Sequence, residues 1–241
     1  MLHESILAPY VRKLERRRRL DDAERAALLN LPHRVRQLDR SAYISREGED
    51  TKNCQILLSG FAQSSRTDAR GARALLALHM EGEPLNICGS ADEKSPCDVQ
   101  ALSPLTIASI PNDALISLGV SYPSIAIALW RLAARNASVL SEWLMNVGRR
   151  DARGRISHLI CEIAVRQEAA GVARRPEFVM PLTQEQLGDA TGLTAVHVNR
   201  ILQHLSRDGL LRWRSGRVTI GDWEALKAAG EFRPGYLQLA A

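Results

Sequence analysis

The sequence predicts an α+β protein, with a strand-rich N-terminal part, a long helix and a helical C-terminal part that ends in a hairpin. Three observations lead to this prediction. Short segments broken by glycines run from about residue 42 to residue 110, an uninterrupted helical pattern starts at Pro123, and a two-helix motif with two glycines follows it. A chain of 241 residues is long enough for more than one core. We expect domains at residues 1–120, 121–150 and 151–241.

The N-terminal part combines a helical start with short strands. Residues 1–38 have a helical pattern of leucines, with a helix start at Asp21. Segments such as QILLSGFAQSSR and VQALSPLTIASI then alternate with turns, which is typical of a β-sandwich or barrel. The segment ARALLALHM fits a strand or a helix. Glycines recur roughly every ten residues, as strands of this length require, at Gly48, Gly60, Gly71, Gly82 and Gly89.

A long helix is predicted from Pro123 to about Arg150. Its apolar residues recur at steps of four and three, which is the pattern of a coiled-coil seam, and Leu144 and Val147 widen the apolar face. Two interpretations of Asn136 stay open, because it can pair with its symmetry mate or rotate out of the seam and hydrogen-bond locally. The residues predicted to form a dimer interface are Ile125, Leu129, Leu132, Asn136, Val139, Leu140 and Trp143.

The stretch LTQEQLGDATGLTAVHVNRILQHL has the pattern of a helix, a tight turn and a second helix. Gly188 allows the two helices to approach closely, and Gly192 can adopt the left-handed conformation that ends a helix. Thr183 and Gln186 are spaced as a capping box, and Thr194 is placed to cap the second helix. This combination is typical of a DNA-binding helix-turn-helix, and an ordinary helical hairpin is the alternative.

A basic hairpin follows the second helix. The segments LLRWR and RVTI flank a short Ser-Gly turn, and their alternation places Leu211 and Trp213 on the face opposite the arginines. Asp222 is predicted to cap a short closing helix. A helix-turn-helix followed by such a hairpin is a winged helix. Its arginines suit contacts with DNA phosphates, or they form a solvated edge that discourages strand pairing: Arg212, Arg214 and Arg217.

Composition favours a DNA-binding protein in the cytoplasm. The net charge is +5, and the excess of basic over acidic residues lies mostly after residue 148. This asymmetry suits a nucleic-acid-binding C-terminal half. No apolar run reaches the length of a membrane span, and the N-terminus lacks the order of segments found in a signal peptide. We therefore expect a cytoplasmic protein that has no membrane partner.

Cysteines and histidines give no sign of a metal site or an active site. Cys54, Cys88, Cys97 and Cys161 are widely spaced, so we expect thiols and no bound metal or cofactor. No two of the six histidines stand four residues apart with a glutamate beside them, which is the spacing of a metal-binding helix. The chain also lacks a G-x-S-x-G sequence and a glycine-rich phosphate loop. We do not expect an enzyme.

Taken together, these features resemble the Crp/Fnr family of bacterial transcription regulators. The match rests on LTQEQLGDATGLTAVHVNRILQHLSRDGLL, on REGE from Arg46, on LLSG from Leu57 and on Gly82-Glu83. The resemblance implies a cyclic-nucleotide-binding-like β-roll at the N-terminus and a homodimer. It also implies binding to a two-fold symmetric operator in double-stranded DNA, with recruitment or blocking of RNA polymerase.

The resemblance also assigns roles in the second helix of the motif, expected at residues 194–208. Arg200 matches the family arginine that contacts a guanine or a phosphate. Val196 stands where the family often has a glutamate or another base-reading residue. The base preference therefore has to come from other side chains. The full set of predicted DNA-binding residues is Thr183, Gln184, Thr194, Ala195, Val196, His197, Asn199, Arg200, Gln203, Arg212, Arg214 and Arg217.

Chemistry suggests what each reading residue would recognise. Asn199 suits adenine, and the methyl groups of Ala195 and Val196 suit the methyl group of thymine. His197 suits a base, a phosphate or a water molecule. Thr183 matches a position that contacts the DNA backbone, and so does the corresponding threonine at the start of the second helix.

Two departures from the family concern the signal that the protein senses. Cyclic-nucleotide binders carry an Arg-Ser pair after their Gly-Glu turn, and SADEKSPCDVQ here lacks it. We therefore do not expect cyclic AMP or cyclic GMP to bind in the usual way. The oxygen-sensing branch carries an N-terminal cysteine cluster for an iron–sulfur centre, and the first cysteine here is Cys54. The effector stays unknown. The alternative function is a ligand- or redox-responsive signalling module whose helix-turn-helix serves protein contacts.

Overall fold

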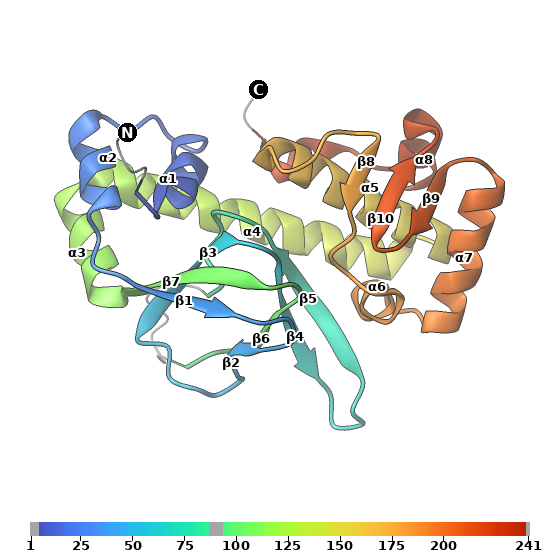
Figure 1. Cartoon of the computed structure of the whole chain (residues 1–241), viewed down its shortest axis with the longest axis horizontal. Coiled ribbons are helices and arrows are strands. Elements are labelled where there is room, and N and C mark those ends of the chain that lie inside the picture. The colour runs from blue at the N-terminus through green and yellow to red at the C-terminus, as the bar shows by residue number, and fades with distance from the viewer. Residues whose placement is uncertain (1–4, 87–93, 240–241) are drawn as a thin grey trace. The chain divides into compact units, whose positions relative to one another are not determined.

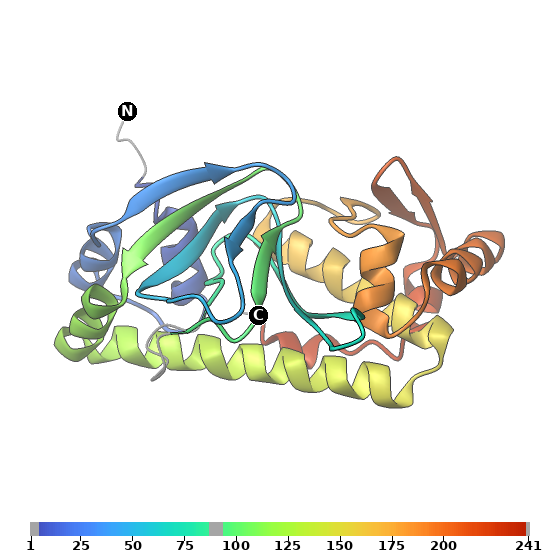
Figure 2. The same cartoon turned by 90° about the horizontal axis from the view of Figure 1, so that it is seen from below.

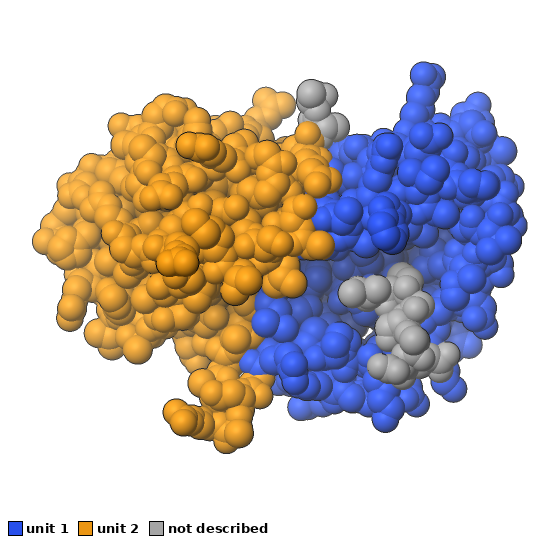
Figure 3. All heavy atoms as spheres, turned by 180° about the vertical axis from the view of Figure 1, so that it is seen from behind, with its two compact units in different colours: residues 1–66, 76–136, 240 blue, residues 67–75, 137–239, 241 orange. Residues whose placement is uncertain are grey.

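The computed structural model describes residues 5–86 and 94–239. The chain divides into two compact units, which Figure 3 colours separately. The first unit comprises residues 1–66 and 76–136, and the second comprises residues 67–75 and 137–239. The division falls inside the long helix, whereas the sequence placed domain boundaries at either end of it. The expected roles of Cys88 and Gly89 fall outside the described residues.

The first unit holds two antiparallel sheets with helices at its start and end (Figure 1). One sheet has the strand order β1-β7-β3 and the other β2-β6-β4-β5. This is the strand-rich module that the sequence predicts. The elements in chain order are α1 (Ala8–Glu15), α2 (Asp22–Leu29), β1 (Arg34–Leu38), β2 (Tyr43–Ser45), β3 (Asn53–Ser59), β4 (Ala62–Thr67), β5 (Arg73–His79), β6 (Asp98–Ala101), β7 (Leu105–Pro111) and α3 (Asn112–Ser121).

Two apolar cores stabilise this unit. The core between the sheets contains Leu57, Val99 and Ile107, which the period of two places on the inner faces of their strands. The second core lies between β3, β7 and the helices, with Tyr10 and Leu132 fully or almost fully buried. Glycines with a positive φ turn the chain at the four predicted positions that the structure describes: Gly48, Gly60, Gly71 and Gly82.

Two expectations for this unit need correction. The helical pattern assigned to residues 1–38 ends at Leu29, and residues 34–38 form β1, which pairs with β7. Pro32 breaks the helix, and the edge of β7 supplies partners for the backbone that follows. Cys54 is disulfide-bonded rather than a free thiol, whereas Cys97 and Cys161 are free. The ambiguous segment ARALLALHM is a strand, β5.

The helix α4 (Pro123–Arg149) is a single helix of 27 residues, as the sequence predicts, and Figure 2 shows it unbroken. Its last residues belong to the second unit. The other elements of that unit are α5 (Ala152–Ala170), β8 (Glu177–Val179), α6 (Gln184–Thr191), α7 (Ala195–Arg207), β9 (Leu211–Arg214), β10 (Arg217–Ile220), α8 (Trp223–Ala229) and the 3-10 helix η1 (Pro234–Leu237).

Candidate nucleic-acid interface

Helices α6 and α7 form the predicted helix-turn-helix. A Cβ atom at Gly188 would collide with the carbonyl oxygen of Leu193, so only glycine permits this approach of the helices. Gly192 ends α6 in the left-handed conformation, with φ of 67°. Val198 points back into the core and is fully buried. The sequence-based interpretation of both glycines is thereby confirmed.

The two predicted caps fix the start of each helix. The Thr183 hydroxyl accepts from the Gln186 backbone N–H at 3.2 Å, and the Gln186 side chain accepts from the Thr183 N–H at 2.9 Å. The Thr194 hydroxyl accepts from the His197 N–H at 3.3 Å. Each cap satisfies a donor that a helix N-terminus leaves free. The Thr194 cap therefore fixes where α7 begins, next to the residues predicted to read DNA.

One face of α7 is open to solvent. The residues predicted to read DNA lie on it, while Val198, Leu202 and Leu205 form the buried face. Val196 is the most exposed large apolar side chain of α7, with 72% of its surface accessible. The exposed residues are Thr194, Ala195, Val196, His197, Asn199, Arg200 and Gln203.

Amide side chains connect α7 to the start of α6. The Asn199 amide nitrogen donates to Gln184 Oε1 at 3.0 Å, and the Gln203 amide nitrogen donates to Asn199 Oδ1 at 2.9 Å. Both ends of the Asn199 amide are thus engaged in the free protein. Asn199 has to exchange these partners before it can read an adenine edge with its donor and its acceptor.

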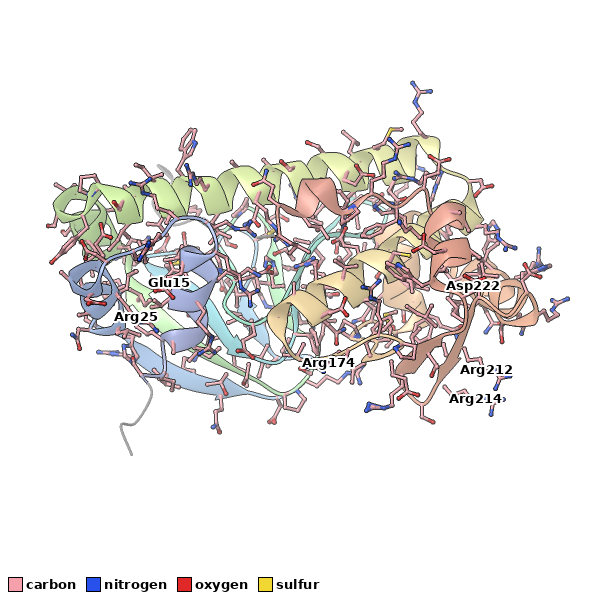
Figure 4. The ribbon with its side chains drawn as sticks, turned by 90° about the horizontal axis from the view of Figure 1, so that it is seen from above. Glu15, Arg25, Arg174, Arg212, Arg214 and Asp222 are labelled. Carbon is pink, nitrogen blue, oxygen red and sulfur yellow. The ribbon has the colours of Figure 1, made fainter. Side chains whose placement is uncertain are left out.

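The wing is a three-stranded sheet in the order β8-β10-β9. Ser215 and Gly216 both have positive φ, which is the two-residue turn that matches the twist of a hairpin. Leu211 is buried, and the side chains of Arg212 and Arg214 extend from β9 into solvent (Figure 4). Arg217 is also exposed. The strand β8 was not predicted from the sequence; in it the buried Phe178 lies between two exposed residues.

The predicted dimer residues on α4 occupy different environments. Ile125, Leu132 and Trp143 are buried within their own chain, with exposed fractions of 0%, 2% and 6%. Leu129 and Val139 are half-buried, whereas Leu140 is exposed. Asn136 is exposed, and its Oδ1 accepts from the side chain of the neighbouring Arg135 at 3.1 Å. This local bond corresponds to the second of the two interpretations of Asn136.

An adjacent row on α4 is more exposed. Its members recur at steps of four and three, one position along from the predicted seam, so they lie about 100° around the helix. The row includes Trp130, which is 75% exposed, and Leu144, which is 75% exposed. All of its members are apolar: Ala126, Trp130, Ala133, Ala137, Leu140, Leu144 and Val147.

Other kinds of site find little support in the described ranges. No group of three or more His, Cys, Asp or Glu side chains there is arranged to hold a metal ion. None of the helices described is both long enough and apolar enough to cross a membrane.

Known proteins match both halves of the chain. Residues 35–122 match the cyclic nucleotide-binding domain family, and residues 154–229 match the Crp-like helix-turn-helix domain family. The anaerobic regulatory protein of Haemophilus influenzae is 23% identical over 207 residues, which cover 86% of this chain and 80% of the relative. The transcriptional activator protein FnrA of Stutzerimonas stutzeri is 24% identical over 196 residues, covering 81% and 80%.

Solved structures agree on the fold. The structure of FixK2 from Bradyrhizobium japonicum superimposes with a TM-score of 0.76 at 18% identity, covering 83% of this chain and 98% of that one. A capped helix-turn-helix with an exposed reading face and a basic wing defines a winged-helix DNA-binding protein. With a cyclic-nucleotide-binding-type domain ahead of it, the chain belongs to the Crp/Fnr family of transcription regulators.

Proposed function

We propose that the protein acts as a cytoplasmic homodimer that recognises a two-fold symmetric operator and thereby regulates transcription by RNA polymerase. The observation that carries this proposal is the exposed, capped face of α7 beside a basic wing. In a two-fold dimer, two such helices enter successive major grooves about one helical turn apart.

Arg200 is the proposed base reader of this surface. Its side chain is exposed at the second turn of α7, and no ion pair to it is found among the described residues. A guanidinium group that is free in the unbound protein can bind the O6 and N7 atoms of guanine in bidentate form. Arg212, Arg214 and Arg217 would contact phosphates, which position the wing without reading sequence.

Site selection from randomised duplex DNA tests this proposal. We expect the reduced protein to enrich a two-fold symmetric sequence without added ligand. Arg200→Ala should weaken binding by roughly 1–3 kcal/mol and relax the preference at one base pair of each half-site. Arg19→Ala removes the same charge from an exposed position in the first unit and serves as the control. Unchanged affinity and base preference in Arg200→Ala would contradict the assignment.

The exposed row on α4 is the proposed dimer interface. Its residues recur at the steps of four and three that a coiled coil uses. Unlike Ile125, Leu132 and Trp143, they are not already buried within their own chain. Leu144→Asp should therefore shift the protein from dimer to monomer in analytical ultracentrifugation. Met145→Asp changes an exposed neighbour that lies outside the row and should leave the dimer intact. A dimeric Leu144→Asp variant would contradict this interface.

The effector stays open. Cyclic AMP and cyclic GMP are not expected to bind in the usual way, because the stretch SADEKSPCDVQ after Gly82-Glu83 has no Arg-Ser pair. Enrichment of the symmetric site without any added ligand would fit a first unit that serves as a ligand-free platform. A requirement for an added ligand would overturn that view.

A further inference from the structure

A buried carboxylate joins three segments of the second unit. Glu162 on α5 is fully buried. Its Oε1 pairs with the Arg166 guanidinium of the same helix at 3.0 Å. Its Oε2 accepts from the Trp143 indole of α4 at 2.9 Å and from the Tyr236 hydroxyl of η1 at 2.7 Å. One oxygen is therefore satisfied within α5, and the other holds α4 and the C-terminal segment to it.

The C-terminal segment, residues 230–238, fits tightly against these helices. A Cβ atom at Gly230 would lie 2.5 Å from the backbone nitrogen of His158, so α5 and the segment are in backbone contact. The His158 ring lies between Gly230 and Tyr236, with Nδ1 3.0 Å from the Gly230 carbonyl oxygen and Nε2 3.1 Å from the Tyr236 hydroxyl, and the neutral ring has one N–H to donate to either of them. Gln238 donates to Ser138 on α4 at 3.5 Å. The segment therefore contacts both α5 and α4.

The covalent link between α4 and α5 is short. Only Arg150 and Asp151 separate the two helices, and the Asp151 carboxylate caps α5 by accepting from the Gly154 N–H at 2.7 Å. Asn146 adds one bond across the turn, to the Arg155 carbonyl oxygen at 3.2 Å. The direction in which α5 leaves α4 is then fixed further along the helices by the bonds to Glu162.

Helix α5 packs against α6, α7 and α8. The direction in which α5 leaves α4 therefore sets where the proposed DNA-reading elements lie relative to the end of α4. We propose that Glu162 is a positioning residue that sets the direction of the winged helix on the end of α4, and so the operator half-site spacing that the dimer accepts. The inference rests on the proposed dimer and symmetric operator. A polar cluster that merely stabilised the fold would change affinity for all DNA alike, without changing the preferred spacing.

Two conservative variants test this role while leaving the Glu162–Arg166 pair in place. Trp143→Phe and Tyr236→Phe each remove one donor to Oε2 and keep an aromatic ring. Trp223→Phe is the matched control, because Trp223 lies in the same unit and packs against Arg175 and Phe232 rather than Glu162. The DNA probes are duplexes with one half-site, and duplexes with two half-sites separated by spacers of stepped length.

We expect the wild type and Trp223→Phe to bind two half-sites best at one spacing. Trp143→Phe and Tyr236→Phe should lose roughly five- to fiftyfold at that spacing, broaden the preference to neighbouring spacings, and bind the single half-site within about twofold of wild type. An unchanged spacing preference would overturn the positioning role. A parallel loss on the single half-site would also overturn it, because the cluster would then only hold the domain together.

Hydrogen exchange of the free protein separates this inference from the proposed function. Faster exchange is expected in the last turn of α4 and in residues 230–238 of both variants, with unchanged exchange in α6 and α7. Failure of the wild type to select any symmetric site would contradict the proposed operator. In that case the exchange data still decide whether Glu162 holds α4, and unchanged exchange in both variants would overturn it.

Discussion

Glu83 in the first unit and Glu162 in the second are both buried carboxylates, and each binds a different half of α4. Glu83 lies between cations: its Oε1 is 2.8 Å from Lys13 of α1 and 3.2 Å from Arg135 of α4. Glu162 instead binds one cation and two neutral donors, Trp143 and Tyr236. The difference shows that one helix can be held by charge in one unit and by directional neutral hydrogen bonds in the other.

The groups around each carboxylate determine how strongly its loss, or the loss of one of its partners, destabilises the protein. Near Glu83, burial lowers the pKa of Arg17, the charge of Arg135 lowers it further, and the charge of Glu83 raises it. Loss of Glu83 would remove the carboxylate that lies 2.8 Å from Lys13 and 3.2 Å from the buried Arg135. Loss of one donor to Glu162 leaves the carboxylate with Arg166 and the other donor. Two cations around one carboxylate are therefore the more fragile arrangement.

The largest expected effect is at Glu83. Replacement by Gln removes the negative charge that offsets Lys13 and Arg135, and should destabilise the first unit by about 3–5 kcal/mol, as for other broken buried pairs. Urea unfolding, followed by a probe within the first unit, measures this loss of unfolding free energy. Glu15→Gln is the control, because the Glu15–Arg25 pair is partly exposed and should contribute about 0–1 kcal/mol (Figure 4). Equal losses in the two variants would contradict the comparison.

An intermediate effect is expected at Glu162. Trp143→Phe and Tyr236→Phe should each cost about 1.5–3 kcal/mol, the usual contribution of a hydrogen bond to a charged group. Both donors bind the same Oε2 atom, so their contributions should be coupled. The loss of unfolding free energy in the double variant should therefore differ clearly from the sum of the losses in the two single variants. A double-mutant cycle in urea measures this coupling. Strict additivity would show that the two donors act independently.

The smallest expected effect is a pH dependence specific to the second unit. Burial, and next to it the charge of Arg150, lowers the pKa of His158 below its ordinary value of 6.5, while the Gly230 carbonyl, Glu162 and Glu142 oppose this shift. The unfolded chain therefore binds a proton near pH 6.5 that the folded protein does not yet bind. Stability should be full above about pH 6.5 and fall as the pH drops towards the lowered pKa.

Unfolding of the second unit at stepped pH values between about 8 and 5 tests this slope. His158→Gln should flatten it, and His204→Gln, on an exposed part of α7, should retain the wild-type slope. A wild-type slope in His158→Gln would assign the pH dependence to another group.

Local patterns predicted the C-terminal unit well. The caps at Thr183 and Thr194, the glycines of the helix-turn-helix and the hairpin at Ser215 each depend on neighbours within a few residues. Such signals are contained in a short window of sequence, and they gave α6, α7, β9 and β10 nearly to the residue. The long helix from Pro123 was equally clear, because its periodicity continues over many turns.

The environment of each face of α4 was beyond the sequence pattern. Two rows of apolar residues, one position apart, both follow the heptad step, and only the packing of the domain shows which row is already covered. Ile125 and Leu132 are buried in the first unit, and Trp143 is held by Glu162. The roles of Glu83 and Glu162 were missed as well, because their partners on other elements lie between 19 and 74 residues away in the sequence. No spacing rule connects such distant positions.

The exposure of Val196 has a consequence for the heat-capacity change of DNA binding. An aliphatic side chain that is 72% exposed in the free protein carries ordered hydration water, which a major-groove contact would expel. Burial of apolar surface on binding gives a negative change in heat capacity. The enthalpy of operator binding should thus become more favourable on warming, and the temperature dependence of recognition is set partly by one valine.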